Sequence, residues 1–427
     1  MEKGQVFKGD IIFTPTPQQF ETLKGGYIVV LNGKVKGVYN ELPPIFGGLP
    51  LHDFGRRLIL PGFVDLHVHA SQYYLTGVGL DNELIPWLNN HTFPLEGRFA
   101  DPEFAREAYS RFVEELIRQG TLRACIFATI HKESTAILFE LLAVRGIGAF
   151  VGKVNMDRNC PHYLQETTAA SLAETEVLII EYGGHPLVKP IATPRFAPTS
   201  SPELLAGLGR LVQKYRLPVQ SHLGENRQEV VWVKELFPSL ATYADVYHHF
   251  GLLGQTPTLM AHAIHLQERE LMLIANNAVR LVHCPESNIN LTSGIMPVRE
   301  LLDRGIRLGL GSDIGAGHNT ALYRVMVRAI QLSKLRNYYD PRIKPLTTAE
   351  VFYLGTKGGG SFFGKVGSFE PGYDFDAIVV DDGSLPTADF SLEERLQRFI
   401  YTGAAGNITA RFVQGERISC AQSERGK

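Results

Sequence analysis

The sequence lacks any long apolar run. None of its segments approaches the roughly 20 consecutive apolar residues that a membrane-spanning helix needs. The first residues, Met1-Glu2-Lys3-Gly4-Gln5, also lack the basic-then-apolar order of a secretory signal. We therefore expect a cytoplasmic protein that has no membrane among its partners.

Cysteine is scarce in this chain of 427 residues. The four cysteines, Cys125, Cys160, Cys284 and Cys420, are far apart in the sequence, and none forms a C-x-x-C pair. This spacing argues against a disulfide scaffold and against a zinc site made of thiolates. It suits a protein of a reducing compartment.

A strong charge imbalance is also absent. Lys and Arg number 42 and Asp and Glu 44, which gives a formal net charge of −2 and an isoelectric point near 6.7. A nucleic-acid binder would usually carry a basic field, so we expect no nucleic-acid partner, and a nucleobase ligand would be a free base. Hydrophobic residues at 44% and charged residues at 20% are typical of a globular protein and exclude broad disorder.

From about residue 59 onward, apolar strands alternate with helices. Asp101-Pro102 and Ser201-Pro202 each combine an N-cap residue with a proline at the first helical position. Alternation of this kind predicts an α/β fold, a (β/α)8 TIM-like barrel over residues 59–368. The expected strands are 59–69, 121–130, 148–157, 188–196, 218–226, 257–265, 279–285 and 307–315.

Both ends of the chain contain shorter strand-like segments. In residues 1–58 the clearest is 27–31, which lies between the turn signals Gly25-Gly26 and Asn32-Gly33. In residues 369–427 the segments 375–380 and 408–413 have the same character. We expect the two ends to pair with each other and to form a small β-sandwich domain beside the barrel.

Polar residues gather where the expected strands end. His67 and His69 lie two residues apart on a strand, so their imidazoles project from the same face. In a (β/α)8 barrel the chemistry collects at the carboxyl ends of the strands, where these side chains would meet. The residues at these ends are His67, His69, His222, Glu225, His262 and Asp313.

Three imidazoles and one carboxylate suit a single Zn²⁺ or Fe²⁺ and leave a place for water. The metal would lower the pKa of that water toward neutrality and so generate hydroxide. Glu225 is placed to carry protons, and His262 to orient the water, with Asp313 accepting a hydrogen bond from it. The expected ligands are His67, His69, His222 and Asp313.

A single buried His or Asp at a strand end is usually a hydrogen-bonded polar group rather than a ligand. Several such residues at the same end of four strands are hard to explain in that way. His283 lies at the end of the seventh strand, and the sequence leaves open whether it acts in the site or only supports it. Cys284 has no identifiable neighbouring base, so we do not assign it as a nucleophile.

The pattern H-x-H, H-x-x-E, a further His and a final Ser-Asp resembles the deaminase branch of the amidohydrolase superfamily. The similarity runs from about 55 to 380, and its loops resemble the guanine deaminase family in particular. Residues 157–162 and 318–320 depart from that family's pattern. The segments that carry the resemblance are 67–73, 86–88, 92–94, 127–131, 151–154, 189–196, 221–227 and 283–285.

This resemblance implies hydrolytic deamination of guanine to xanthine and ammonia at one Zn²⁺ per chain, in a homodimer. It makes Glu225, His262 and Asp313 the catalytic residues. Arg195 offers only hydrogen-bond donors, so it would donate to the O6 carbonyl of guanine and find no acceptor in the 6-amino group of adenine. The implied contacts to the base come from Gln72, Trp87, Arg195, Phe196, His222 and Glu225.

Three alternatives remain at this stage. A related aminohydrolase acting on 8-oxoguanine, a pterin or a triazine would use the same metal chemistry. A two-metal hydrolase of cyclic amides would need a lysine at the end of the fourth strand, but Lys189 lies six residues before Arg195, toward the other end. A non-catalytic scaffold with this fold would be expected to lose metal ligands, whereas this chain retains them all.

Overall fold

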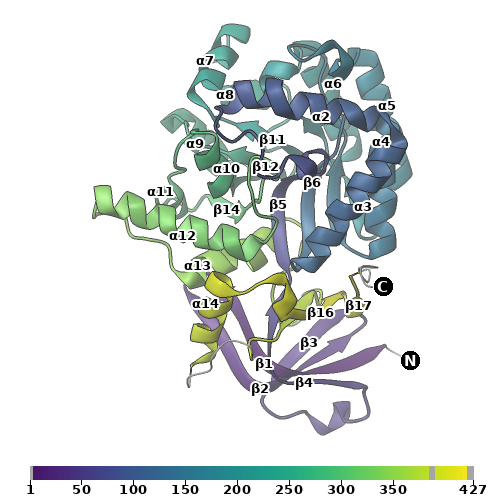
Figure 1. The fold of residues 1–427 in the computed structure, drawn as a ribbon, viewed down its shortest axis with the longest axis vertical. Coiled ribbons are helices and arrows are strands. Elements are labelled where there is room, and N and C mark those ends of the chain that lie inside the picture. The colour runs from purple at the N-terminus through teal and green to yellow at the C-terminus, as the bar shows by residue number, and fades with distance from the viewer. Residues whose placement is uncertain (1–2, 384–389, 421–427) are drawn as a thin grey trace.

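The computed structural model describes residues 3–383 and 390–420 (Figure 1). Residues 1–2, 384–389 and 421–427, which belong to the two predicted end segments, lie outside the described residues. Within the described part, no helix is both long and apolar enough to cross a membrane.

Two four-stranded parallel sheets occupy the middle of the chain. Backbone hydrogen bonds join them on both sides: Gln220 N donates to Ala192 O at 2.9 Å, and Asp313 N donates to His67 O at 2.8 Å. The first sheet contains β5 (Phe63–His69), β6 (Thr121–Phe127), β7 (Gly148–Gly152) and β9 (Val188–Pro190). The second contains β11 (Val219–Leu223), β12 (Thr258–His262), β13 (Val279–His283) and β14 (Arg307–Leu310), while β8 (Val154–Asn155) and β10 (Thr193–Pro194) form a separate pair.

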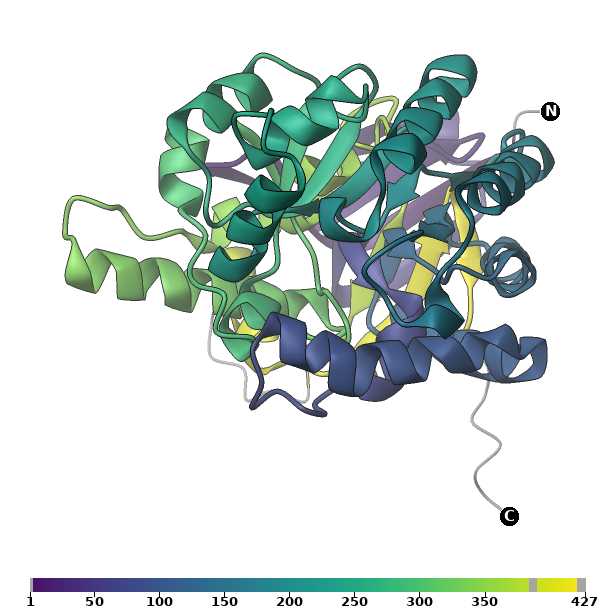
Figure 2. The same ribbon diagram turned by 90° about the horizontal axis from the view of Figure 1, so that it is seen from above.

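Helices surround these strands, as the view from above shows (Figure 2). The two predicted caps are present: Asp101 accepts a hydrogen bond from Glu103 N at 2.9 Å, and Ser201 from Leu204 N at 3.1 Å. The α-helices are α1 (Leu84–Trp87), α2 (Phe93–Gly97), α3 (Pro102–Arg118), α4 (Lys132–Arg145), α5 (Thr168–Tyr182), α6 (Pro202–Tyr215), α7 (Arg227–Leu236), α8 (Tyr243–His249), α9 (Glu268–Ala275), α10 (Pro285–Asn290), α11 (Val298–Asp303), α12 (Leu322–Tyr339), α13 (Thr348–Tyr353) and α14 (Leu392–Thr402). Short 3₁₀ and π turns are η1 (Pro44–Phe46), η2 (Ala70–Leu75), η3 (Leu88–Thr92), η4 (Arg98–Ala100), η5 (His162–Leu164), η6 (Ala197–Thr199), η7 (Leu354–Gly358) and η8 (Ala405–Asn407).

Strands from both ends of the chain share one seven-stranded sheet, at the bottom of Figure 1. Antiparallel pairing of β15 with β4 joins the C-terminal part to the N-terminal part. In order across the sheet the strands are β17 (Glu416–Ile418), β16 (Ile408–Val413), β15 (Ala377–Val380), β4 (Leu51–Pro61), β1 (Gly4–Thr16), β2 (Gln19–Leu31) and β3 (Lys34–Tyr39).

Glycines at two places in the chain have positions that differ from the sequence expectation. Gly25-Gly26 does not begin a strand but lies within β2, where Gly25 has a φ of 63° and donates its N–H to Asp10 at 2.8 Å. The segment expected as one strand over 59–69 is two, β4 and β5, separated by Gly62. A Cβ at Gly62 would lie 2.4 Å from Leu122, so only glycine fits where the chain passes from one sheet to the other.

The end sheet is attached to the parallel strands by apolar packing and by buried ion pairs. Arg123 of β6 donates to Asp376 at 2.6 Å, and both side chains are buried. Within the end region itself, Arg395 of α14 is held by Asp10 and Asp382. The pair of Arg123 with Asp376 fixes the base of the parallel strands, while their carboxyl ends at the opposite side remain available to form a site.

Candidate active site

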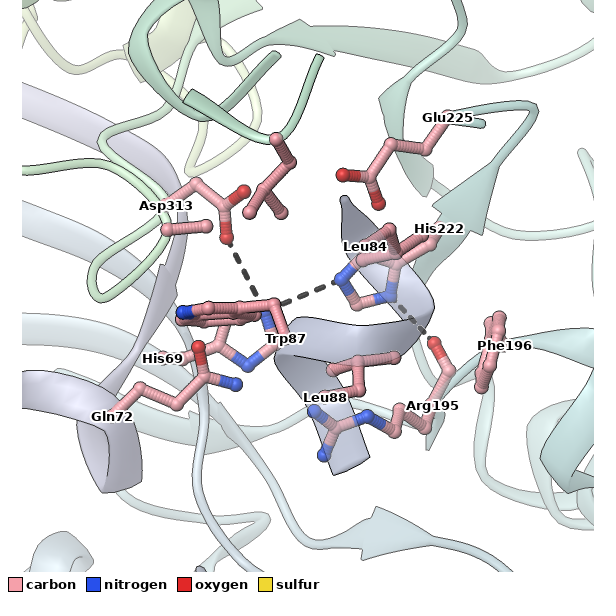
Figure 3. Close-up of a pocket in the computed structure, with 12 residues that line it drawn as sticks. His69, Gln72, Leu84, Trp87, Leu88, Arg195, Phe196, His222, Glu225 and Asp313 are labelled. Carbon is pink, nitrogen blue, oxygen red and sulfur yellow. Dashed lines mark hydrogen bonds and ion pairs between the residues drawn. The ribbon is translucent and has the colours of Figure 1, made fainter. Parts of the chain in front are cut away.

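The predicted metal ligands meet at the carboxyl ends of the parallel strands. His67 and His69 lie on β5, His222 on β11, and Asp313 in the loop after β14. His67 Nε2 lies 3.2 Å and His69 Nε2 3.4 Å from Asp313 Oδ1, and the Nε2 atoms of His69 and His222 are 3.2 Å apart. Residues from strands far apart in the sequence therefore converge on one point (Figure 3).

This cluster fits a divalent metal ion. One set, His67, His69 and Asp313, and another, His67, His222 and His262, each place their ligand atoms within 4.8 Å of one another. The buried Nε2 of His67 has no hydrogen-bond partner. Burial lowers the pKa of His69 and of His222 well below the ordinary value, so both imidazoles stay neutral, as metal ligands must.

Hydrogen bonds fix which ring nitrogen faces the centre. His222 Nδ1 donates to the Arg195 carbonyl at 2.6 Å, which leaves Nε2 directed at the cluster. His262 Nδ1 bonds Asn288 Oδ1 at 2.8 Å, so its Nε2 faces Glu225 Oε2 at 3.4 Å and Asp313 Oδ2 at 3.7 Å. The backbone and an amide therefore set the tautomers of two of the predicted residues.

The carboxyl groups of the site differ in protonation. Burial and the nearby Asp313 raise the pKa of Glu225 well above its ordinary value. Burial opposes ionisation of Asp313 as well, but the neighbouring His67 and His262 lower its pKa well below its usual range. One carboxyl group can therefore hold a transferable proton while the other stays an anion beside it, which is the separation of roles that acid–base catalysis needs.

A pocket with about 380 Å³ of empty space, part of it open to solvent, lies at this cluster. Its apolar lining would suit a flat ring, and polar groups lie at opposite ends of it (Figure 3). The lining residues are His69, Gln72, Leu84, Trp87, Leu88, Arg195, Phe196, His222, Glu225, Leu291, Asp313 and Ala316. All the base contacts expected from the sequence are among them.

Some residues of the site were not expected from the sequence. Glu96 of α2 is buried and bonds both Gln72 and Arg195. Sequence spacing gives no sign of this, because Glu96 is a lone acid in a short helix and Arg195 lies 99 residues away. The others are Asp65, Glu229, Asn288 and Ser293, each of which bonds a site residue.

Five residues discussed from the sequence do not line the pocket: His67 and His262, which belong to the metal-binding cluster, and His283, Cys284 and Lys189. His283 is buried but does not line it, and burial lowers its pKa to about 3. Cys284 lies near His262 and Asp313, but burial raises the pKa of its thiol well above normal, so it is not a thiolate. Lys189 of β9 is exposed and cannot bridge two metals in this site.

Comparison with known proteins agrees with this geometry. The model of the amidohydrolase family matches residues 58–418. The chain belongs to the amidohydrolase family. Its curated relatives include guanine deaminases. It is 40% identical over 376 residues to the guanine deaminase of Dictyostelium discoideum, covering 86% of this chain and 83% of that protein. It is 34% identical over 409 residues to that of Escherichia coli K12, covering 93% and 91%.

A solved amidohydrolase structure with a ligand is also closely similar. The guanine deaminase from C. acetobutylicum, with guanine bound in its active site, superposes with a TM-score of 0.96. The two chains are 52% identical, and the match covers 97% of this chain and 100% of the other. The family membership and the deaminase branch expected from the sequence are therefore confirmed.

Proposed function

We propose that this chain is a guanine deaminase, which hydrolyses guanine at C2 to xanthine and ammonia. The observation that carries this proposal is the likeness to the guanine-bound deaminase, at 52% identity and a TM-score of 0.96. The pocket is consistent with it, because an apolar slot connects a metal-binding cluster with an arginine and an amide. The substrates are then a free purine base and water.

One metal ion per chain completes the site in this proposal. His67, His69, His222 and Asp313 hold it, and Zn²⁺ is the first candidate because nitrogen and oxygen donors of this kind suit it, with Fe²⁺ the second. When bound, the ion acts as a Lewis acid that lowers the pKa of a water molecule. The orphaned Nε2 of His67 and the neutral state of His69 support this assignment.

Proton transfer is assigned to Glu225. The carboxylate accepts a proton from the attacking water and delivers it to N3 of guanine, so that no charge accumulates on the ring as C2 becomes tetrahedral. The same group then passes a second proton to the departing amine. His262, 3.4 Å from Glu225, and Asp313 orient the water by hydrogen bonding.

Recognition of the base is assigned to the opposite end of the pocket. Arg195 donates to O6 of guanine, and Gln72 bonds the ring edge. Phe196 and Trp87 contribute apolar surface to the slot. Adenine carries a donor at position 6, so it would leave the buried guanidinium unpaired, and discrimination on that basis is typically large.

The architecture proposed with this function is a closed (β/α)8 barrel over residues 59–368. The two parallel sheets and the hydrogen bonds between them support it. In this proposal residues 1–58 and 369–427 form the small β domain. The sequence predicts a β-sandwich for this domain, and its described strands share one sheet.

Assembly and location are also proposals. A homodimer is proposed from the family resemblance; Tyr338 and Tyr339 at the end of α12 are 79% and 78% exposed. A cytoplasmic location is supported by the free thiols of all four cysteines, which suit a reducing compartment.

The test is ammonia release by the purified, metal-analysed protein. Guanine is compared with adenine, cytosine, 8-oxoguanine, a pterin and an aminotriazine. Release from guanine alone, with about one metal per chain, supports the proposal. Release from one of the other rings instead would keep the chemistry and replace the substrate. A chain that binds no metal and releases no ammonia would be a non-catalytic scaffold.

A further inference from the structure

One buried carboxylate binds both recognition side chains at once. Glu96 Oε1 accepts a hydrogen bond from Gln72 Nε2 at 2.9 Å, and Glu96 Oε2 accepts one from Arg195 Nη1 at 2.6 Å. Gln72 and Arg195 line the pocket, whereas Glu96 does not. Glu96 therefore acts on any ligand through its two neighbours and not by touching it.

Burial makes these contacts directional. Glu96 and Arg195 are each 3% exposed and Gln72 is 2% exposed, so water does not compete for their hydrogen bonds. Phe93, one helical turn before Glu96 on α2, packs against the guanidinium, whose central carbon lies 5.2 Å from the ring centroid. A single short helix thus holds Arg195 from two sides.

The carboxylate also decides which way the Gln72 amide points. An ionised carboxylate can only accept hydrogen bonds, so Gln72 must turn its Nε2 toward Glu96. Its Oε1 then faces the N–H of Gly315 at 3.4 Å. With these groups engaged, Gln72 and Arg195 retain N–H groups for the ligand. Such a pair suits an acceptor such as an oxo group and leaves an amino group without a partner.

We propose that Glu96 is a positioning residue for base recognition, which fixes Gln72 and Arg195 in the orientation that selects an oxo group over an amino group at position 6. This inference rests on the proposed function. It also explains how a guanidinium can be buried in a pocket for a neutral base, because the adjacent carboxylate balances its charge.

The test compares Glu96→Gln with the unaltered chain. A carboxamide at position 96 can donate or accept, so the Gln72 amide is free to reverse. We expect the KM for guanine to rise about 100-fold, since small misplacements of recognition groups have effects of that size. The competing ligand is 2,6-diaminopurine, which carries an amino group at position 6. The selectivity ratio, its inhibition constant divided by the KM for guanine, should be at least about tenfold lower in Glu96→Gln than in the unaltered chain. Glu107→Gln is the matched control, because Glu107 also bonds an arginine, Arg111 at 2.8 Å, but its side chain is 61% exposed.

A merely structural role would lower activity without changing this selectivity ratio, and that result would overturn the inference. So would an unchanged KM for guanine. Should Glu96→Gln fold poorly because it leaves a buried guanidinium unpaired, the double variant Glu96→Gln/Arg195→Gln removes both charges. Positioning predicts that the loss of kcat/KM in the double variant is smaller than the product of the two single losses, whereas independent roles predict that the two losses multiply. Ammonia release by the unaltered chain tests the proposed function separately.

Discussion

We expect replacement of Glu225 by glutamine to remove the proposed proton transfer and little else. The two side chains have the same shape, so the contacts to His262 at 3.4 Å and to Ser293 at 3.5 Å can persist. The backbone of residue 225 is held independently, because its N–H donates to Glu229 at 2.9 Å. The metal-binding cluster does not include Glu225, so the metal content should stay the same.

The expected loss follows from the role of the carboxyl group. General acid–base catalysis contributes about 10²- to 10⁴-fold to a rate, and the same group is assigned to both proton transfers. At about 1.4 kcal/mol for each factor of ten, this range is about 3 to 5.5 kcal/mol of transition-state stabilisation. We expect a loss near the upper end in kcat and in kcat/KM, because the amide can neither take nor return a proton.

The assay is steady-state ammonia release from guanine, with the metal content of each preparation measured in parallel. Ser293→Ala serves as the control, since it removes only the long hydrogen bond to the same carboxyl group, and its kcat should change less than about tenfold. If Glu225→Gln retains a full metal site and more than a tenth of the kcat, another group carries the protons and the assignment of Glu225 is wrong.

Three further predictions concern the metal and the stability of the fold. Dialysis against a chelator should abolish ammonia release, and added Zn²⁺ should restore it; activity that survives complete metal removal would contradict the proposed chemistry. Burial lowers the pKa of His283 from 6.5 to about 3 in the folded chain. The unfolded chain therefore takes up this proton at a higher pH than the folded chain, and the free energy of unfolding falls as the pH drops from about 6.5 to about 3. At pH 4.5 the loss is about 3 kcal/mol, and urea unfolding at pH 7 and 4.5 should show that His283→Gln is less acid-sensitive by that amount. Arg395→Met leaves the buried Asp10 and Asp382 without their cation, so urea unfolding should show a free energy of unfolding lower by about 3 to 5 kcal/mol. An unchanged free energy of unfolding would contradict this prediction.

The strands and the cluster of ligands could be predicted because local sequence determines them. The segment expected at 279–285 corresponds to β13 (Val279–His283), and the one at 408–413 to β16 (Ile408–Val413). Apolar strand bodies followed by polar residues are visible in the chain itself. Parallel strands that end at one side then bring His67, His222 and Asp313 together without further information.

The hydrogen-bond partners of the site could not be predicted in the same way. Glu96 and Arg195 are 99 residues apart, and Asp65 and Ser312 are 247 apart. No periodicity or spacing connects such pairs, because each depends on how two separate parts of the chain are placed after folding. Gly62 is a similar case, since the need for glycine arises from contact with Leu122 of another strand.

Three of these unexpected residues are buried carboxylates that accept hydrogen bonds from the residues around the pocket. Asp65 accepts from the backbone N–H groups of His67 and Ser312, at 3.1 and 3.0 Å, where the first and last parallel strands meet. Glu229 accepts from the N–H of Glu225, and Glu96 from Gln72 and Arg195. Each of them accepts these hydrogen bonds through its carboxyl oxygens and so fixes the direction of the donors around it. The backbone of the proposed ligand His67, the backbone of the proposed proton carrier Glu225 and the proposed recognition groups each contact a different acid, so their geometry can be perturbed separately at these three positions.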